Sequence, residues 1–252
     1  MVESRTRLDG RAADTLRPFA IETGIQRNPE GSVAVRAGGT RVLVAASTEE
    51  GVKEFLRGTG RGWVTAEYAM HPRANPERQR RDRGGQIDGR SQEIQRLIGR
   101  ALRAAVRPEK LGERMLTVDC DVLDADGGTR TASITGGFVA LAIALEKLRA
   151  RGLAEPGVLR EPVAAVSVGL VDGVALLDLN YQEDSRAQVD LNLVATASGS
   201  LIEVQGTAEG EPMTRAEHDA MVELGLAGIR ELVRMQEQAL EAAGVNLARL
   251  LG

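Results

Sequence analysis

The chain has 252 residues, of which 42% are hydrophobic, 27% are charged and 2% are aromatic, and its net charge is −4. This composition excludes a disordered chain, a collagen-like chain and a disulfide scaffold, and the length fits one large domain or two small ones. The charge is unevenly spread, since residues 57–107 hold twelve arginines against five acids, a charge of +7, which leaves −11 for the rest of the chain. A basic segment in an acidic chain indicates a polyanionic partner.

The first half of the chain is predicted to start with a β-hairpin. Val33–Arg36 and Arg41–Ser47 are typical of strands, and Gly38-Gly39 between them is typical of a tight turn. Residues 55–63 form a glycine-punctuated loop, and residues 71–88 form a polar loop that is rich in arginine. Apolar residues at helical spacing then predict a helix from Ser91, its expected N-cap, through residue 105.

The second half is predicted to hold five strands and two helices. A half-buried strand, residues 116–122, ends in a turn at 124–128, and a buried helix follows over Ser133–Arg149. The remaining predicted elements are a hairpin of Val163–Val171 with Val174–Tyr181, the strands Val189–Thr196 and Leu201–Gln205, and a helix from the Thr214 capping box to about Ala243. This order predicts a mixed α/β sheet with helices packed on it. Because no linker interrupts the chain, we expect a single domain over residues 1–252.

The glycines between the predicted strand and the buried helix form a candidate phosphate site. Gly128 lets the backbone approach an anion, and the helix that follows directs unpaired N–H groups toward it. Thr129 adds a hydroxyl donor and Arg130 a guanidinium fork. An ordinary turn with a capping serine explains the same residues, and their spacing does not match a P-loop. The glycines at 58, 60 and 62 likewise do not match a dinucleotide fingerprint.

Two acids near the end of the predicted hairpin form a candidate metal site. Asp190 interrupts an apolar strand, where a carboxylate is costly unless it is paired or binds a metal, and Asp184 lies shortly before it. One or two carboxylates together with a substrate phosphate are the usual ligands of Mg²⁺. A salt bridge to Arg186 or simple solvation of a turn remains open, and Asp178 competes as another acid on a strand.

Arginine accounts for 29 of the 32 basic residues, and its planar fork binds phosphate through paired hydrogen bonds. Codon bias explains the excess over lysine equally well. Arg90 lies at the start of the first predicted helix, where its side chain could reach an anion, although an arginine is expected there by chance in so basic a segment. The scarcity of aromatic residues argues against base stacking as the main grip on a nucleic acid.

Other kinds of site find little support. Two histidines and one cysteine, Cys120, make a zinc site improbable, and neither histidine lies in a triad pattern. A single cysteine also favours a reducing compartment, and the longest apolar run, residues 136–145, is half of a membrane span. We therefore expect a cytoplasmic protein with no membrane segment.

Taken together, these motifs closely resemble the ribonuclease PH family of phosphate-dependent 3′ exoribonucleases, also called tRNA nucleotidyltransferases. The resemblance covers essentially the whole chain. It rests on Phe55–Gly58, Gly62–Tyr68, Glu93–Arg103, Asp126–Ala132, Glu183-Asp184-Ser185 and Glu203–Glu209. It implies an α/β sandwich of the ribosomal protein S5 domain 2-like type and a homohexameric ring built as a trimer of dimers.

The resemblance also implies roles for individual residues. Arg90, Gly128, Thr129 and Arg130 match the phosphate-binding positions of the family. Asp184 and Asp190 match its paired active-site aspartates, which are implicated in binding Mg²⁺ and in protonating the leaving group. The loop that grips tRNA is matched by Arg73, Arg78, Arg80 and Arg81.

The expected reaction is phosphorolysis of RNA. Inorganic phosphate attacks the last phosphodiester of a tRNA precursor, or of other structured RNA such as rRNA, and releases a nucleoside diphosphate. Two alternatives stay open: a non-catalytic RNA-binding ring subunit of the exosome type, and a hydrolytic nuclease with two metals. The complete arginine and aspartate sets argue against the first, and the few clustered acids argue against the second.

Overall fold

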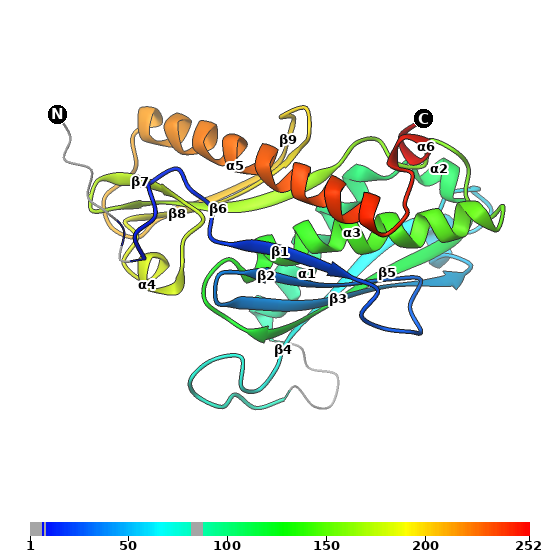
Figure 1. Cartoon of the computed structure of the whole chain (residues 1–252), viewed down its shortest axis with the longest axis horizontal. Helices are drawn as coiled ribbons and strands as arrows, with labels where there is room; N and C mark the ends of the chain where they lie inside the picture. Colours follow the sequence, from blue (N-terminus) through cyan, green and yellow to red (C-terminus); the bar gives the residue numbers. More distant parts are fainter. Residues whose placement is uncertain (1–6, 8, 82–87) are drawn as a thin grey trace.

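The computed structural model describes residue 7, residues 9–81 and residues 88–252. Its strands form two separate sheets (Figure 1). The first sheet has the order β1-β2-β3-β5-β4, with β4 and β5 parallel and the other neighbours antiparallel. The second is antiparallel and has the order β7-β6-β8-β9. The strands are β1 (Phe19–Thr23), β2 (Gly31–Ala37), β3 (Thr40–Glu50), β4 (Trp63–Met70), β5 (Arg114–Asp124), β6 (Val163–Val171), β7 (Val174–Leu177), β8 (Val189–Thr196) and β9 (Leu201–Ala208).

Helices separate and cover the two sheets. They are α1 (Gly89–Ala105), α2 (Pro108–Leu111), α3 (Thr129–Ala150), α4 (Tyr181–Asp184), α5 (Arg215–Ala242) and α6 (Leu247–Leu251), with one 3₁₀ turn at Glu54–Leu56. Helix α3 lies between the sheets, and α5 lies along the outer face of the second sheet (Figure 1). The result is a layered α/β sandwich, which confirms the predicted fold class.

Helix α3 is buried on nearly all sides because both sheets pack against it. By length and hydropathy it is the one helix of the described chain that could cross a membrane, but 83% of that apolar window is buried inside the protein. Its glycines permit close packing, since a Cβ atom on Gly136 would lie 2.3 Å from Cγ2 of Val35. The glycine pair that weakens the helical pattern in the sequence is thus explained by contact with the first sheet.

Strand β6 is apolar at almost every position of its sequence, and its packing explains why. Val163 and Ala165 belong to the core around α3, whereas Ala164, Val166 and Val168 belong to the core under α5. Alternate side chains therefore enter two different cores, and both faces of the strand are buried.

The structure confirms most of the predicted elements and corrects several of their ends. The N-terminal hairpin, β5, the β6–β7 hairpin, β8 and the capping box at Thr214 are present. Strands β1 and β4 were not predicted as separate elements, and β7 ends at Leu177 because Asp178 has a positive φ of 53°. Of the predicted loop 71–88, residues 82–87 lie outside the described part, and the described residues of this loop, 71–81 and 88, form no helix or strand.

Candidate functional site

The turn between β5 and α3 is built for close approach to an anion. Gly127 and Gly128 have φ values of 75° and 64°, a conformation that favours glycine, and Gly128 is the N-cap of α3. A Cβ atom on Gly127 would lie 2.7 Å from the carbonyl oxygen of Leu179. No side chain of the described residues caps this helix end, so its first N–H groups remain free for a ligand.

Thr129 and Arg130 lie in the first turn of α3, and not in a loop before it. The predicted start at Ser133 was wrong by four residues, because Gly128 in the left-handed conformation ends the turn. Ser133 is not a cap, since its Oγ donates to the carbonyl oxygen of Thr129 at 2.8 Å. The hydroxyl of Thr129 lies 2.9 Å from that of the buried Tyr68 on β4, which fixes the threonine side chain.

Arg17 supports the glycine turn from behind, a role that the sequence did not reveal. Its guanidinium donates to the carbonyl oxygen of Asp126 at 2.5 Å and lies 3.4–3.5 Å from that of Gly127. It also pairs with the buried Asp178, with Nη2–Oδ1 at 2.7 Å and Nε–Oδ2 at 3.1 Å. Asp178, which was weighed as a possible metal-binding strand acid, is thus the counter-ion of Arg17.

Asp184 is carried by α4, a single turn held from two directions. The backbone N–H of Tyr181 donates to Oδ1 of Asp126 at 3.2 Å, which places the helix against the glycine turn. Glu183 forms a capping box at the start of α4 and a buried salt bridge with Arg7, with Oε1 2.7 Å from Nε. Arg7, like Arg17, belongs to the N-terminal segment, and no motif in the sequence distinguishes either arginine.

Asp190 lies on β8, beside Asp184, and the protein opposes its ionisation. Burial, and next the negative charge of Asp184, raise the pKa of Asp190 to about 6. Its Oδ2 accepts from Nδ2 of Asn192 at 3.3 Å, whereas its buried Oδ1 has no hydrogen-bond partner among the described residues. Partial burial also raises the pKa of Asp184, although the residue as a whole is exposed.

Arg90 and Arg130 bring positive charge to the two aspartates. The charges of both arginines act on the carboxylates of Asp184 and Asp190 and oppose the rise of their pKa values. Arg90 is exposed and lies in the first turn of α1. Arg90, Arg130, Asp184 and Asp190 therefore lie near one another, and Gly128 and Thr129 directly precede Arg130 in the chain.

The start of α1 differs from the prediction. The N-cap is Asp88, whose carboxylate accepts hydrogen bonds from the backbone N–H and the hydroxyl of Ser91 at 3.0 Å and 2.6 Å. Ser91 is therefore the third helical residue and not the cap. An ionised aspartate is favoured at this end because it also interacts with the helix dipole.

A backbone hydrogen bond holds the arginine-rich loop, which begins at residue 71, next to the glycine turn. The carbonyl oxygen of Ala74 accepts from the backbone N–H of Ala125 at 2.9 Å, and Ala74 itself is buried. From this anchor the loop projects below the first sheet in Figure 1. The predicted RNA-binding side chains on it are exposed and form no ion pair within the described chain: Arg73, Arg78, Arg80 and Arg81.

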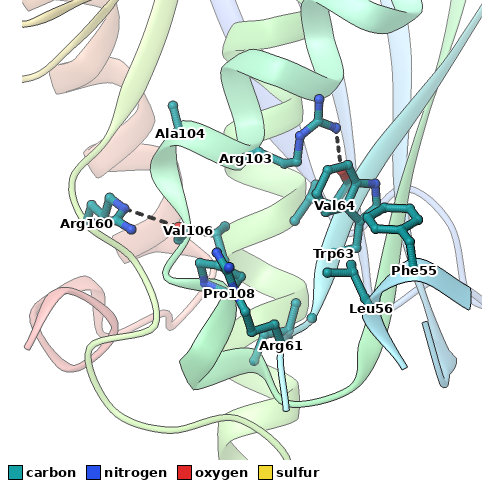
Figure 2. A pocket seen from close by; sticks show the side chains of 12 residues that line it. Phe55, Leu56, Arg61, Trp63, Val64, Arg103, Ala104, Val106, Pro108 and Arg160 are labelled. Atoms are coloured by element: carbon teal, nitrogen blue, oxygen red, sulfur yellow. Dashed lines mark hydrogen bonds between the residues drawn. The ribbon is translucent and has the colours of Figure 1, made fainter. Parts of the chain in front are cut away.

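A mostly apolar cavity of about 470 Å³ lies elsewhere, between β4 and the end of α1 (Figure 2). Arg103 lies over the ring of Trp63 at 4.4 Å, and Phe55 contacts the same ring edge-on, with centroids 5.5 Å apart. None of the predicted phosphate, aspartate or loop residues lines this cavity.

Comparison with protein families gives matches along most of the chain. Residues 15–145 match the model described as 3′ exoribonuclease family, domain 1, and residues 161–228 match domain 2 of the same family. Ribonuclease PH of Corynebacterium glutamicum is 55% identical over 238 residues, which cover 94% of this chain and 97% of that protein. Ribonuclease PH of Crocosphaera subtropica is 54% identical over 237 residues, with 94% and 98% covered.

Solved structures share the fold at lower identity. Rice (Oryza sativa) Rrp46 superimposes with a TM-score of 0.75 at 21% identity and covers 93% of this chain and 100% of its own. The Archaeoglobus fulgidus exosome with RNA bound to the active site superimposes with a TM-score of 0.77 at 23% identity, with 91% and 92% covered.

Proposed function

The chain belongs to the ribonuclease PH family, and from that premise we propose that Arg90, Thr129 and Arg130 hold the attacking phosphate while Asp184 and Asp190 act at the RNA 3′ end. Membership makes the chain a phosphate-dependent 3′ exoribonuclease that processes tRNA. The assignment of these residues is supported by the glycine turn of α3, whose uncapped N–H groups lie beside two arginines and two carboxylates.

In the reaction, an oxygen of inorganic phosphate forms a bond to the phosphorus of the last phosphodiester. The bond from that phosphorus to the 3′ oxygen of the preceding nucleotide breaks, and a nucleoside diphosphate leaves. The 3′ oxygen takes up a proton, so the RNA ends in a hydroxyl and is one residue shorter. Two anions must meet, and the guanidinium groups of Arg90 and Arg130 together with the Gly128 amide offset their repulsion.

The aspartate pair suits both proton transfer and a divalent cation. Because the pKa of Asp190 is raised to about 6, the pair is able to carry the proton that the leaving 3′ oxygen needs. Its unpartnered buried Oδ1 and the charge of Asp184 next to it fit Mg²⁺, which prefers carboxylate oxygens. Bound Mg²⁺ would supply positive charge that stabilises the transferring phosphoryl group. Within the described residues no cluster of three or more ligating side chains competes for the metal.

The proposal extends to assembly and place of action. A homohexamer built as a trimer of dimers is what the family resemblance implies, and a cytoplasmic location agrees with a single buried cysteine, Cys120. Light scattering in solution tests the first point, since six chains of 26.9 kDa are readily distinguished from one or two.

The activity is tested with a tRNA that carries extra 3′ nucleotides, incubated with the protein and Mg²⁺, with and without inorganic phosphate. We expect nucleoside diphosphates only when phosphate is present, because phosphate is the attacking group. Monophosphates formed without phosphate would indicate a hydrolytic nuclease. RNA binding with no trimming under either condition would indicate a non-catalytic subunit.

Replacing Arg73, Arg78, Arg80 and Arg81 together by glutamine should weaken tRNA binding and flatten its salt dependence. Each lost phosphate contact lowers the slope of log affinity against log salt by roughly 0.7 for single strands and 0.9 for duplexes. The measurement is a titration of tRNA binding at several salt concentrations.

A control variant carries the same change of charge away from the loop. It replaces four exposed arginines, the C-cap of α3 and three residues of α5, namely Arg151, Arg215, Arg230 and Arg234. An equal loss of slope in both variants would show that net charge, and not contact with the loop, controls the affinity.

A further inference from the structure

Arg130 is held by a chain of hydrogen bonds that joins three elements. Its Nη1 donates to Oε1 of Gln205 on β9 at 2.7 Å. The Nε2 of Gln205 in turn donates to Oε1 of Glu93 on α1 at 3.0 Å, and this second bond fixes which way the amide of Gln205 faces. Nη1 of Arg130 lies farther from Glu93 itself, at 3.5 Å.

The register of the second sheet places Gln205 on the same face as Asp190. Gln205 lies directly opposite Asn192 on β8, and Asn192 donates to the carboxylate of Asp190. Directly opposed residues of an antiparallel pair share a face of the sheet, as do residues two apart on one strand. Gln205 and Asn192 therefore stand side by side, one bonded to Arg130 and the other to Asp190.

We propose that Gln205, oriented by Glu93, is the positioning residue that sets the guanidinium of Arg130 for the attacking phosphate. The inference rests on the proposed role of Arg130 in binding that phosphate. Neither Gln205 nor Glu93 is assigned contact with substrate.

A neutral amide suits this role better than a carboxylate would. An arginine side chain loses much rotamer freedom when it is fixed, and a partner that fixes it beforehand lowers the cost of binding a ligand. Gln205 accepts one hydrogen bond from the guanidinium but leaves its positive charge in place. The carboxylate of Glu93 lies 3.5 Å from Nη1 of Arg130, a longer contact than the 2.7 Å bond to Gln205, so the neutral amide is the nearer partner of the guanidinium.

The same helix and strand supply a matched control. Glu203, two residues before Gln205, pairs with Arg100 on α1 through two hydrogen bonds of 2.6 Å and 3.0 Å. This pair also joins β9 to α1, but it makes no contact with Arg130. A substitution at Glu203 therefore disturbs the same interface without touching the arginine of the phosphate site.

The test compares Gln205→Met with Glu203→Met, since methionine keeps the length of both side chains and removes their hydrogen bonds. For Gln205→Met we expect KM for phosphate to rise about tenfold, the loss typical of one hydrogen bond to a charged group, with kcat at saturating phosphate and tRNA affinity little changed. Glu203→Met should keep the parental KM for phosphate. Thermal unfolding of both variants shows whether each remains folded.

A second experiment tests whether Glu93 acts on Arg130 through Gln205. Glu93→Ala should raise KM for phosphate in the parent but add at most about twofold in Gln205→Met, because residues that act in series are not additive. Parental KM for phosphate in Gln205→Met, or an equal rise in Glu203→Met, would overturn the inference. A parent that releases no diphosphates with phosphate would instead refute the proposed function itself.

Discussion

Asp190→Asn is expected to abolish phosphorolysis and, in the absence of divalent metal at about pH 8, to raise the free energy of unfolding by about 1–3 kcal/mol. On the proposed mechanism activity should be lost, because an amide neither carries the proton nor binds Mg²⁺ as a carboxylate does. Stability rises because burial and the neighbouring charge of Asp184 disfavour ionised Asp190 in the folded chain. One substitution therefore moves function and stability in opposite directions.

The sign of the pH dependence follows from the raised pKa. The pKa of Asp190 goes from its ordinary 3.8 to about 6 on folding, so the folded chain holds this proton more tightly than the unfolded chain. The contribution of Asp190 to the free energy of unfolding is therefore greatest below about pH 4, and it falls as the pH rises toward 6. The advantage of Asp190→Asn should appear over that range and vanish below it, as measured by urea unfolding at several pH values.

Asp219 on α5 serves as a comparison, because its pKa is shifted in the opposite direction from that of Asp190. Its pKa is lowered, first by the hydrogen bond with His218 and further by Arg215, so Asp219→Asn should gain no stability at about pH 8. If Asp190→Asn were no more stable than the parent at that pH, the carboxylate of Asp190 would have to be stabilised in the folded chain, and its assignment as a disfavoured anion would be wrong.

Arg17→Met is expected to destabilise the chain by about 3–5 kcal/mol, because it leaves the buried carboxylate of Asp178 without its counter-ion. The two side chains are only 3% and 8% exposed, so water does not replace the lost partner. The substitution also removes the donors to the carbonyl oxygens of Asp126 and Gly127, which should weaken phosphate binding. Urea or thermal unfolding gives the first effect, and KM for phosphate gives the second.

A double variant separates the buried charge from the remaining packing. In Arg17→Met with Asp178→Asn the uncompensated charge is gone, and asparagine tolerates the positive φ of residue 178 and still accepts from the backbone N–H of residue 17. We expect it to recover a large part of the stability. Arg41→Met, which breaks the exposed pair with Asp124, should cost less than about 1 kcal/mol. A double variant as unstable as Arg17→Met alone would contradict the assigned role of the ion pair.

Local patterns in the sequence predict much of this fold. The alternation in β5, the Asp172-Gly173 turn between β6 and β7 and the capping box at Thr214 each depend on residues a few positions apart, and each is present. The ends of elements were predicted less well where one residue decides them. Gly128 begins α3 four residues early through its left-handed backbone, and Asp88 takes the cap position from Ser91.

The sequence brings out the candidate site residues but not the residues that support them. Arg90, Arg130 and the aspartate pair stand in motifs, so the family resemblance identifies them. Arg17 and Arg7 meet partners more than 160 residues further along the chain, and Gln205 is linked to Arg130 across 75 residues. No periodicity or spacing marks such contacts, because only the pairing of the two sheets and α3 brings them together.

The long reach of Arg7 and Arg17 has a consequence for the timing of synthesis. A ribosome adds roughly 5–20 residues per second, so these arginines wait on the order of ten seconds or more before Asp178 and Glu183 emerge. Until then Arg17, which supports the turn at Gly128, lacks its counter-ion, and the strand that carries Asp190 has not been made. If Asp190 acts as proposed, a nascent chain is therefore expected to gain the ability to degrade RNA only after the strand that carries Asp190 has been translated.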